Sequence, residues 1–132
     1  MKTYAFRLKP NQDLRKEIDR FVKEKHIRAG IILTCVGNLK KVVIRMAEAK
    51  VINKYMGSYE IVSLVGTLES GNSHIHISLS DSKGKLIGGH LKEGSIVGIT
   101  AEIVIGELEH REFSRKFDKE TGYDELVVKD FN

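Results

Sequence analysis

Turn-forming residues recur at short intervals through most of this chain, and they set the strongest limit on its fold. Between them lie short runs in which apolar and polar side chains alternate, the pattern of a half-buried β-strand. Strands are expected at 4–8, 31–36, 41–46, 50–55, 60–68, 73–80, 86–91 and 95–108, with turns at 37–38, 56–58, 70–72, 82–84 and 93–94. Such close spacing favours hairpins and a mostly antiparallel sheet.

A single segment follows a different period. Its apolar residues recur at the spacing of one helical stripe and are Leu14, Ile18, Phe21 and Val22. Asn11 or Asp13 can cap the start of this helix, and residues 29–30 are its expected end. With one main helix packed on a sheet, the fold class is α+β. The apolar run at 31–36, between two glycines, is expected to be buried on both faces.

Length and composition indicate one soluble globular domain spanning residues 1–132, with a core at 4–108 and a charged C-terminal extension at 109–132. No apolar run is long enough to span a membrane, and the N-terminus lacks an apolar signal core, so a cytoplasmic protein is expected. The only cysteine, Cys35, lies in an apolar strand and is expected to be a core thiol. The net charge of +4 is scattered, which permits weak DNA binding without arguing for it.

The stretch "SHIHISLSD" places two histidines, His74 and His76, on one face of a strand. A three-residue loop at 82–84, with Gly84 in the left-handed conformation, would pair His76 with His90. His74 would then be the diagonal neighbour of His90, with Cβ atoms about 7–8 Å apart. Three neutral imidazoles on one patch suit zinc, or another divalent first-row metal, and leave a coordination position open.

The residues alone leave alternatives to this metal site. The histidines could instead be partly exposed residues of a sheet face, paired with Glu102 or Asp81. Gly88 and Gly89 would give His90 open space and allow a ligand or backbone to approach closely. Glu102 is either an acceptor that orients a histidine or a solvated strand residue. No serine-nucleophile or nucleotide-binding motif is present, so the catalytic residues are unknown.

The segment "SHIHISLSDSKGKLIGGHLKEGSIVGITAEIVI" resembles the signature of the plant and prokaryote conserved (PPC) domain family. That signature runs H-x-H-x-S-L-x-D, then G-x-x-x-G-G-H-L-x-x-G, then T-x-E. Upstream, "FRLKPNQDL" is similar to the family's R-L-x-x-G-x-D-L start, with Asn11 at the usual glycine, and "EKHIRAGIIL" is similar to its E-x-x-I-x-A-G element. The resemblance covers roughly residues 4–108.

The resemblance implies an α+β subunit that assembles as a homotrimer, with some prokaryotic relatives holding metal at these histidines. Plant members carry an AT-hook with the sequence R-G-R-P, which is absent here, so the chain resembles the stand-alone prokaryotic type. Plant members also contact protein partners through G-R-F-E-I-L. Here "GSYEIVSL" matches that motif at Gly57, Glu60 and Ile61, Tyr59 replaces its phenylalanine, and Ser58 replaces its arginine.

Two functional hypotheses follow. The first is a metal-binding regulatory or DNA-associated homotrimer without enzymatic activity, with weak non-specific DNA binding and a possible protein partner at Gly57, Tyr59, Glu60 and Ile61. The second is a metal-dependent hydrolase or lyase that uses the three histidines, with Glu102 as a base. An open coordination position that faces a substrate-sized pocket would favour the second hypothesis.

Overall fold

Asp13 starts the only α-helix of the chain. In the computed structural model, which describes residues 1–132, its carboxylate accepts a hydrogen bond from the backbone N–H of Lys16 at 3.0 Å. The elements in chain order are β1 Lys2–Leu8, α1 Leu14–Glu24, β2 Gly30–Arg45, the 3₁₀ turn Ala47–Ala49, β3 Ile52–Leu68, β4 His74–Ser80, β5 Leu86–Leu91, β6 Ile96–Glu107, β7 Arg111–Phe117 and β8 Asp124–Asp130. The helix ends before the predicted 29–30, because His26 takes a positive φ of 53° that α-helical backbone does not allow.

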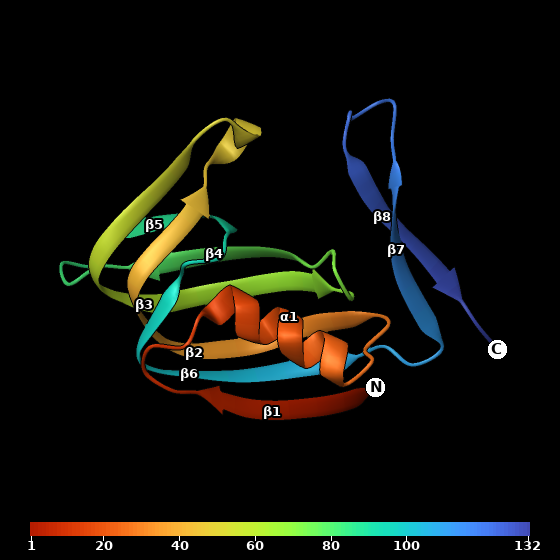
Figure 1. The fold of residues 1–132 in the computed structure, drawn as a ribbon, viewed down its shortest axis with the longest axis horizontal. Coiled ribbons are helices and arrows are strands. Elements are labelled where there is room, and N and C mark those ends of the chain that lie inside the picture. Colours follow the sequence, from red (N-terminus) through yellow and green to blue (C-terminus); the bar gives the residue numbers. More distant parts are fainter.

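Six strands form one antiparallel sheet in the order β1-β6-β2-β3-β4-β5, and α1 lies across one face of it (Figure 1). The sheet also curls, because the end of β2 pairs with β5 through Ile44–Leu91 and Arg45–His90. This second pairing brings two strands together that are far apart in the sequence. The α+β class and the antiparallel sheet are confirmed.

The predicted turns at 37–38 and 56–58 are wrong. Residues 37–38 lie inside β2 and residues 56–58 lie inside β3, and each is one long strand. Gly37 instead occupies an irregularity of the β2–β6 pairing, with a φ of 153°. A Cβ there would lie 2.0 Å from the carbonyl oxygen of Thr100. Glycine in this segment therefore marks a bulge with close backbone approach rather than a turn.

The core lies between α1 and the sheet. It consists of 21 buried residues, including Leu14, Ile18 and Val22 from the helix. The opposite face of the sheet is uncovered, so the predicted double-sided burial of 31–36 is wrong for the single chain. Cys35 is buried, whereas the side chains of Leu33 and Val36 are 43% and 59% exposed.

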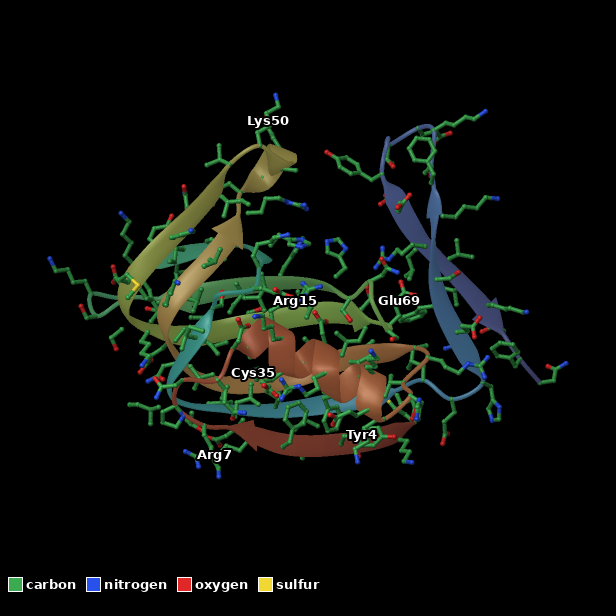
Figure 2. All side chains as sticks on the ribbon, in the orientation of Figure 1. Tyr4, Arg7, Arg15, Cys35, Lys50 and Glu69 are labelled. Atoms are coloured by element: carbon green, nitrogen blue, oxygen red, sulfur yellow. The ribbon has the colours of Figure 1, made fainter.

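The charged extension folds into a two-stranded hairpin of β7 and β8 that stands apart from the sheet (Figure 1). The turn between its two strands includes Gly122, which takes a φ of 79°. The hairpin is attached through β7, where Phe113 is buried and its N–H donates to the carbonyl of Arg28 at 2.9 Å. The guanidinium of Arg115 forms a buried ion pair with Glu69, at 3.1 Å. Figure 2 shows Glu69 at the side of the sheet nearest the hairpin.

Candidate metal centre and pocket

The loop between β4 and β5 fixes the register on which the histidine site depends. Gly84 takes a φ of 81°, and its N–H donates to the carbonyl of Asp81 at 3.0 Å. The Asp81 carboxylate accepts from the N–H groups of Lys83 and Lys85, both at 2.9 Å. As the loop geometry predicts, His76 lies directly opposite His90 in the ladder.

The three histidine rings converge on the surface of the sheet. Their centroids lie 4.8 Å apart for His74 and His76, 5.2 Å for His74 and His90, and 5.7 Å for His76 and His90. One candidate ligand nitrogen from each ring can be chosen so that all three lie within 4.8 Å of one another. The Nε2 atoms of His74 and His76 are 3.1 Å apart. Two imidazole nitrogens on a tetrahedral zinc ion lie about 3.3 Å apart, given bonds of about 2.0–2.1 Å.

Burial and charge both favour the neutral form of these rings. Burial, followed by the charge of the neighbouring Arg45 guanidinium, lowers the pKa of His90 from 6.5 to about 4. Burial, followed by the charge of His76, also lowers the pKa of His74, and Arg115, Arg45 and Arg15 add to that effect. A neutral imidazole is the form that binds a metal ion, so these two side chains are ready ligands at neutral pH.

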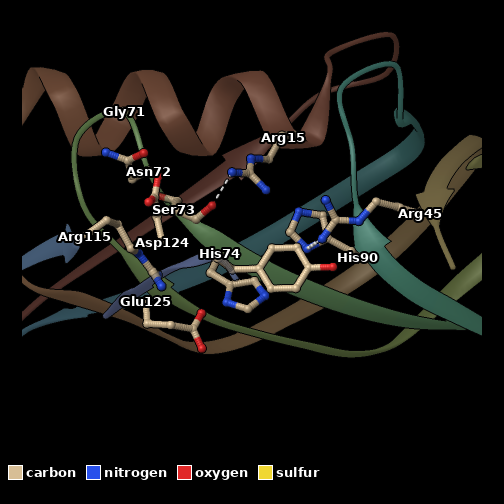
Figure 3. A pocket seen from close by; sticks show the side chains of 11 residues that line it. Arg15, Arg45, Gly71, Asn72, Ser73, His74, His90, Arg115, Asp124 and Glu125 are labelled. Carbon is tan, nitrogen blue, oxygen red and sulfur yellow. Dashed lines mark hydrogen bonds between the residues drawn. The ribbon is translucent and has the colours of Figure 1, made fainter. Parts of the chain in front are cut away.

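An open pocket of about 430 Å³ lies beside the cluster (Figure 3). His74 and His90 line it together with three arginines, Arg15, Arg45 and Arg115. The hairpin contributes Tyr123, Asp124 and Glu125, so the extension forms one wall of the site. Only one of the 11 lining residues is hydrophobic, which makes this a pocket for a polar ligand.

Sequence reasoning missed the arginines and the hairpin residues. Arg45 follows the apolar run "VVI" at the end of β2, and its position opposite His90 depends on the β2–β5 pairing. No local pattern predicts that pairing. The only feature of the sequence that could have pointed to Arg45 is a positively charged residue directly after an apolar strand.

The structure brings Gly88 and Gly89 to the histidines. Both line a second hollow together with His76 and His90. A Cβ on Gly88 would lie 2.7 Å from the carbonyl oxygen of Ile77, and one on Gly89 would lie 2.7 Å from that of Arg45. The glycines therefore permit close strand pairing, and the open space expected beside them is taken up by backbone. Their cofactor-binding role stays a prediction.

Glu102 is not brought to the cluster. It lies on β6, in register with Arg7 and Val36, and two strands separate β6 from β4 in the sheet. Glu102 is exposed, opposite Val36, on the face of the sheet away from the buried Cys35. Burial, followed by the nearby charge of Glu102, raises the pKa of the Cys35 thiol from 9.0 to about 12. A role for Glu102 beside the histidines of its own chain has no geometric support. Cys35 is a buried core thiol, as predicted.

The segment expected to contact a protein partner lies in β3. Gly57 and Glu60 are exposed, Tyr59 packs in part against the core, and Ile61 is 8% exposed. Within the single chain, Ile61 therefore stabilises the core. Partner binding here stays a prediction.

Comparison with known proteins identifies a matching domain family and solved structures of the same fold. Residues 1–109 match the Plants and Prokaryotes Conserved (PCC) domain. A hypothetical protein from Salmonella cholerae-suis is 39% identical, with a TM-score of 0.95 over 98% of this chain and 94% of that one. A metal-containing protein from Archaeoglobus fulgidus is 28% identical, with a TM-score of 0.83 over 96% of this chain and 94% of that one.

Two further comparisons limit which properties of similar proteins can be attributed to this chain. A putative DNA binding protein from Bacteroides thetaiotaomicron has a TM-score of 0.84 over 95% of this chain and 91% of that one, but at 23% identity it shares the fold alone. The Bifunctional protein GlmU of Synechococcus sp. (strain JA-3-3Ab) is 38% identical over 97% of this chain. The chain spans only about a fifth of that relative, 21% of its length. None of the helices here has the length and apolar character that crossing a membrane requires.

Proposed function

Because the chain belongs to the Plants and Prokaryotes Conserved domain family, we propose that it is a metal-binding module of that family. His74, His76 and His90 hold one divalent first-row ion, with zinc as the first candidate. The single observation that supports this proposal is the convergence of three imidazole nitrogens within 4.8 Å. The metal-containing Archaeoglobus fulgidus protein, with the same fold at 28% identity, adds support.

The donor set fits such an ion. The three rings supply three nitrogen ligands, and no cysteine or carboxylate joins the group. Three protein ligands leave a fourth position of a tetrahedral site open to water or to a ligand, as in catalytic and effector sites rather than closed structural ones. A bound ion would supply Lewis acidity beside the pocket.

The test is the metal content of the full chain, measured by native mass spectrometry after purification without added metal and again after incubation with Zn²⁺. We expect one ion per chain, lost in His76→Asn. The matched control is His110→Asn, because His110 is exposed and outside the cluster, and asparagine tolerates its φ of 62°. A chain that binds no ion, or that loses it equally in both variants, would overturn the proposal.

We also propose that the module is a homotrimer. The sheet face opposite α1 carries exposed apolar side chains, among them Leu33, Val36, Val62 and Val65. Val65 is paired with His76, so this apolar patch adjoins the histidines. Light scattering should give three times the 14.9 kDa of one chain. Val36→Lys should dissociate the assembly, whereas Val51→Lys, at another exposed valine, should leave it intact.

We also propose a DNA-associated or regulatory role, which the net charge of +4 permits but does not by itself indicate. Because that charge is scattered, binding should be sequence-indifferent and should weaken steeply with salt. A mobility shift of duplex DNA at low salt that is abolished at 0.2 M salt is the expected result. No shift at low salt would remove this part of the proposal.

The second candidate is a metal-dependent hydrolase or lyase, and the pocket beside the histidines favours it. Tyr123, Asp124 and Glu125 line that pocket and carry groups able to transfer protons. Turnover of activated esters or of carboxylic-acid lyase substrates should require the metal and be lost in His76→Asn. Turnover that survives chelation and the substitution would exclude this site as its source.

A further inference from the structure

The pocket beside the histidines contains three guanidinium groups with different environments. Arg15 is held by the chain itself, because its Nε donates to Asp19 at 3.0 Å and its two Nη atoms donate to the carbonyls of Leu91 and Ser73. Arg115 is held in a similar way by Glu69 at 3.1 Å and by the hydroxyl of Thr67 at 3.3 Å. These two arginines have carboxylate partners in the folded chain.

Arg45 has none. No carboxylate lies within 4.0 Å of its guanidinium, and its one side-chain polar contact is from Nη2 to Nδ1 of His90, at 3.5 Å. A guanidinium has five N–H donors in a planar fork, so most of the donors of Arg45 are unused within the chain. Its side chain is half-buried and lines the pocket.

A metal ion held by His90 would remove the hydrogen bond between Arg45 and His90. A neutral imidazole has one lone pair and one N–H. If His90 binds the ion through Nε2, then Nδ1 carries the hydrogen and cannot accept from Arg45. If His90 binds through Nδ1, the lone pair of that atom is already engaged. In both cases the Arg45 guanidinium is left without an acceptor from the chain, next to a cation.

The two ends of the pocket differ in charge. Figure 3 shows Arg45 beside His90 at one end. Asp124 and Glu125 lie at the other end, near Arg115. The acidic side chains therefore leave the Arg45 end free for an anion, and they offer acceptors to hydroxyl or amino groups of the same ligand.

We propose that this pocket binds a small polar molecule through a carboxylate or phosphate group, which Arg45 holds beside the open position of the metal. This inference rests on the proposed three-histidine metal site. An oxyanion matches the planar fork of the guanidinium and supplies an oxygen to a three-coordinate ion at the same time. Arg45 is thus a ligand-binding residue, and the class of ligand is an organic acid or a phosphate compound.

The test is isothermal titration calorimetry of the full, zinc-loaded chain with two probes, inorganic phosphate and malonate. Arg45→Gln removes the charge and keeps a polar side chain, while Arg45→Lys keeps the charge and loses the fork. The matched control is Arg20→Gln, because Arg20 is 61% exposed on α1 and pairs only with Glu17. The zinc content of each variant is measured in parallel and serves as a check on folding and on the metal site.

We expect saturable binding of at least one probe, weakened about 10- to 100-fold by Arg45→Gln, less by Arg45→Lys and not at all by Arg20→Gln. The probe that binds more tightly identifies the anion class. Zinc bound without any saturable binding of either probe would overturn the inference and leave the metal site intact. Equal weakening in Arg45→Gln and Arg20→Gln would overturn it as well. If no zinc binds, the metal site fails, and the same titrations on the metal-free chain decide whether Arg45 binds the anion alone.

Discussion

The sheet body and the C-terminal hairpin differ sharply in how they are stabilised. The body, β1–β6 with α1, encloses a core of 21 buried residues, whereas all seven residues of β8 are exposed. A two-stranded hairpin is marginal by itself in water, so the hairpin depends on its attachment to the body. The three histidines and Arg45 therefore lie in the well-packed body, whereas one wall of the pocket comes from the hairpin, whose second strand is wholly exposed.

Thiol reactivity should show the largest difference between the two regions. Burial raises the pKa of Cys35 to about 12, so at pH 8 it holds about a thousandfold less thiolate than a thiol of ordinary pKa 9.0. A hairpin probe, Ser114→Cys in a Cys35→Ser background, is exposed. A thiolate of higher pKa is the stronger nucleophile, which offsets part of this difference, so Ellman's reagent should modify the hairpin thiol at least about 30-fold faster. The Cys35 rate should rise as pH increases, since its thiolate forms only near pH 12. Similar rates for the two thiols would contradict the difference in packing.

The same substitution should cost very different amounts in the two regions. Leu79 in β4 is 0% exposed, and Leu126 in β8 is 37% exposed. Leu79→Ala leaves a cavity in the core and should lower the free energy of unfolding by about 2–5 kcal/mol. Leu126→Ala should lower it by less than about 1 kcal/mol. Urea denaturation measures both, and equal losses would show that the hairpin is part of the core.

The docked hairpin should depend more on the buried ion pair that joins it to the body, Arg115–Glu69, than on the exposed pair Arg111–Asp130 within the hairpin. The side chains of Arg115 and Glu69 are 12% and 8% exposed, whereas those of Arg111 and Asp130 are 51% and 72% exposed. Arg115→Ala leaves a buried carboxylate without its cation and should destabilise the docked hairpin by about 1–3 kcal/mol. Arg111→Ala should change it by less than about 1 kcal/mol.

Hydrogen exchange of the β7 and β8 amides is the measurement for this pair of variants. Faster exchange in Arg115→Ala, with the body amides unchanged, is the expected result. Identical exchange in the two variants would mean that the hairpin is held by Phe113 and the Arg28 contacts instead.

The features that the sequence could predict are those set by local chemistry. Asp13 and the apolar stripe predict the helix, and Gly84 in a three-residue loop predicts the register that pairs His76 with His90. The candidate metal cluster follows from that register alone. The cluster could be predicted from the sequence because the loop and the histidine pairs that form it are separated by fewer than about 20 residues.

The features that the sequence could not predict depend on long-range pairing. Gly37 has the same local chemistry in a turn as in a bulge, and only the β2–β6 pairing decides between them. Arg45 meets His90 through the β2–β5 pairing, across 45 residues of sequence. Glu102 alternates like a site residue, but the order of the strands places it away from the histidines. The part of the pocket lined by Arg45 therefore could be identified only from the structure.

The measurement that tests the proposed centre most directly is X-ray absorption at the metal edge of the zinc-loaded full chain. Three imidazole nitrogens at about 2.0–2.1 Å, with oxygen in the remaining position, is the spectrum that a site of His74, His76 and His90 predicts. Adding the anion that binds at Arg45 should change the oxygen shell and leave the three imidazoles in place. Two or fewer imidazoles, or a sulfur ligand, would contradict the three-histidine centre.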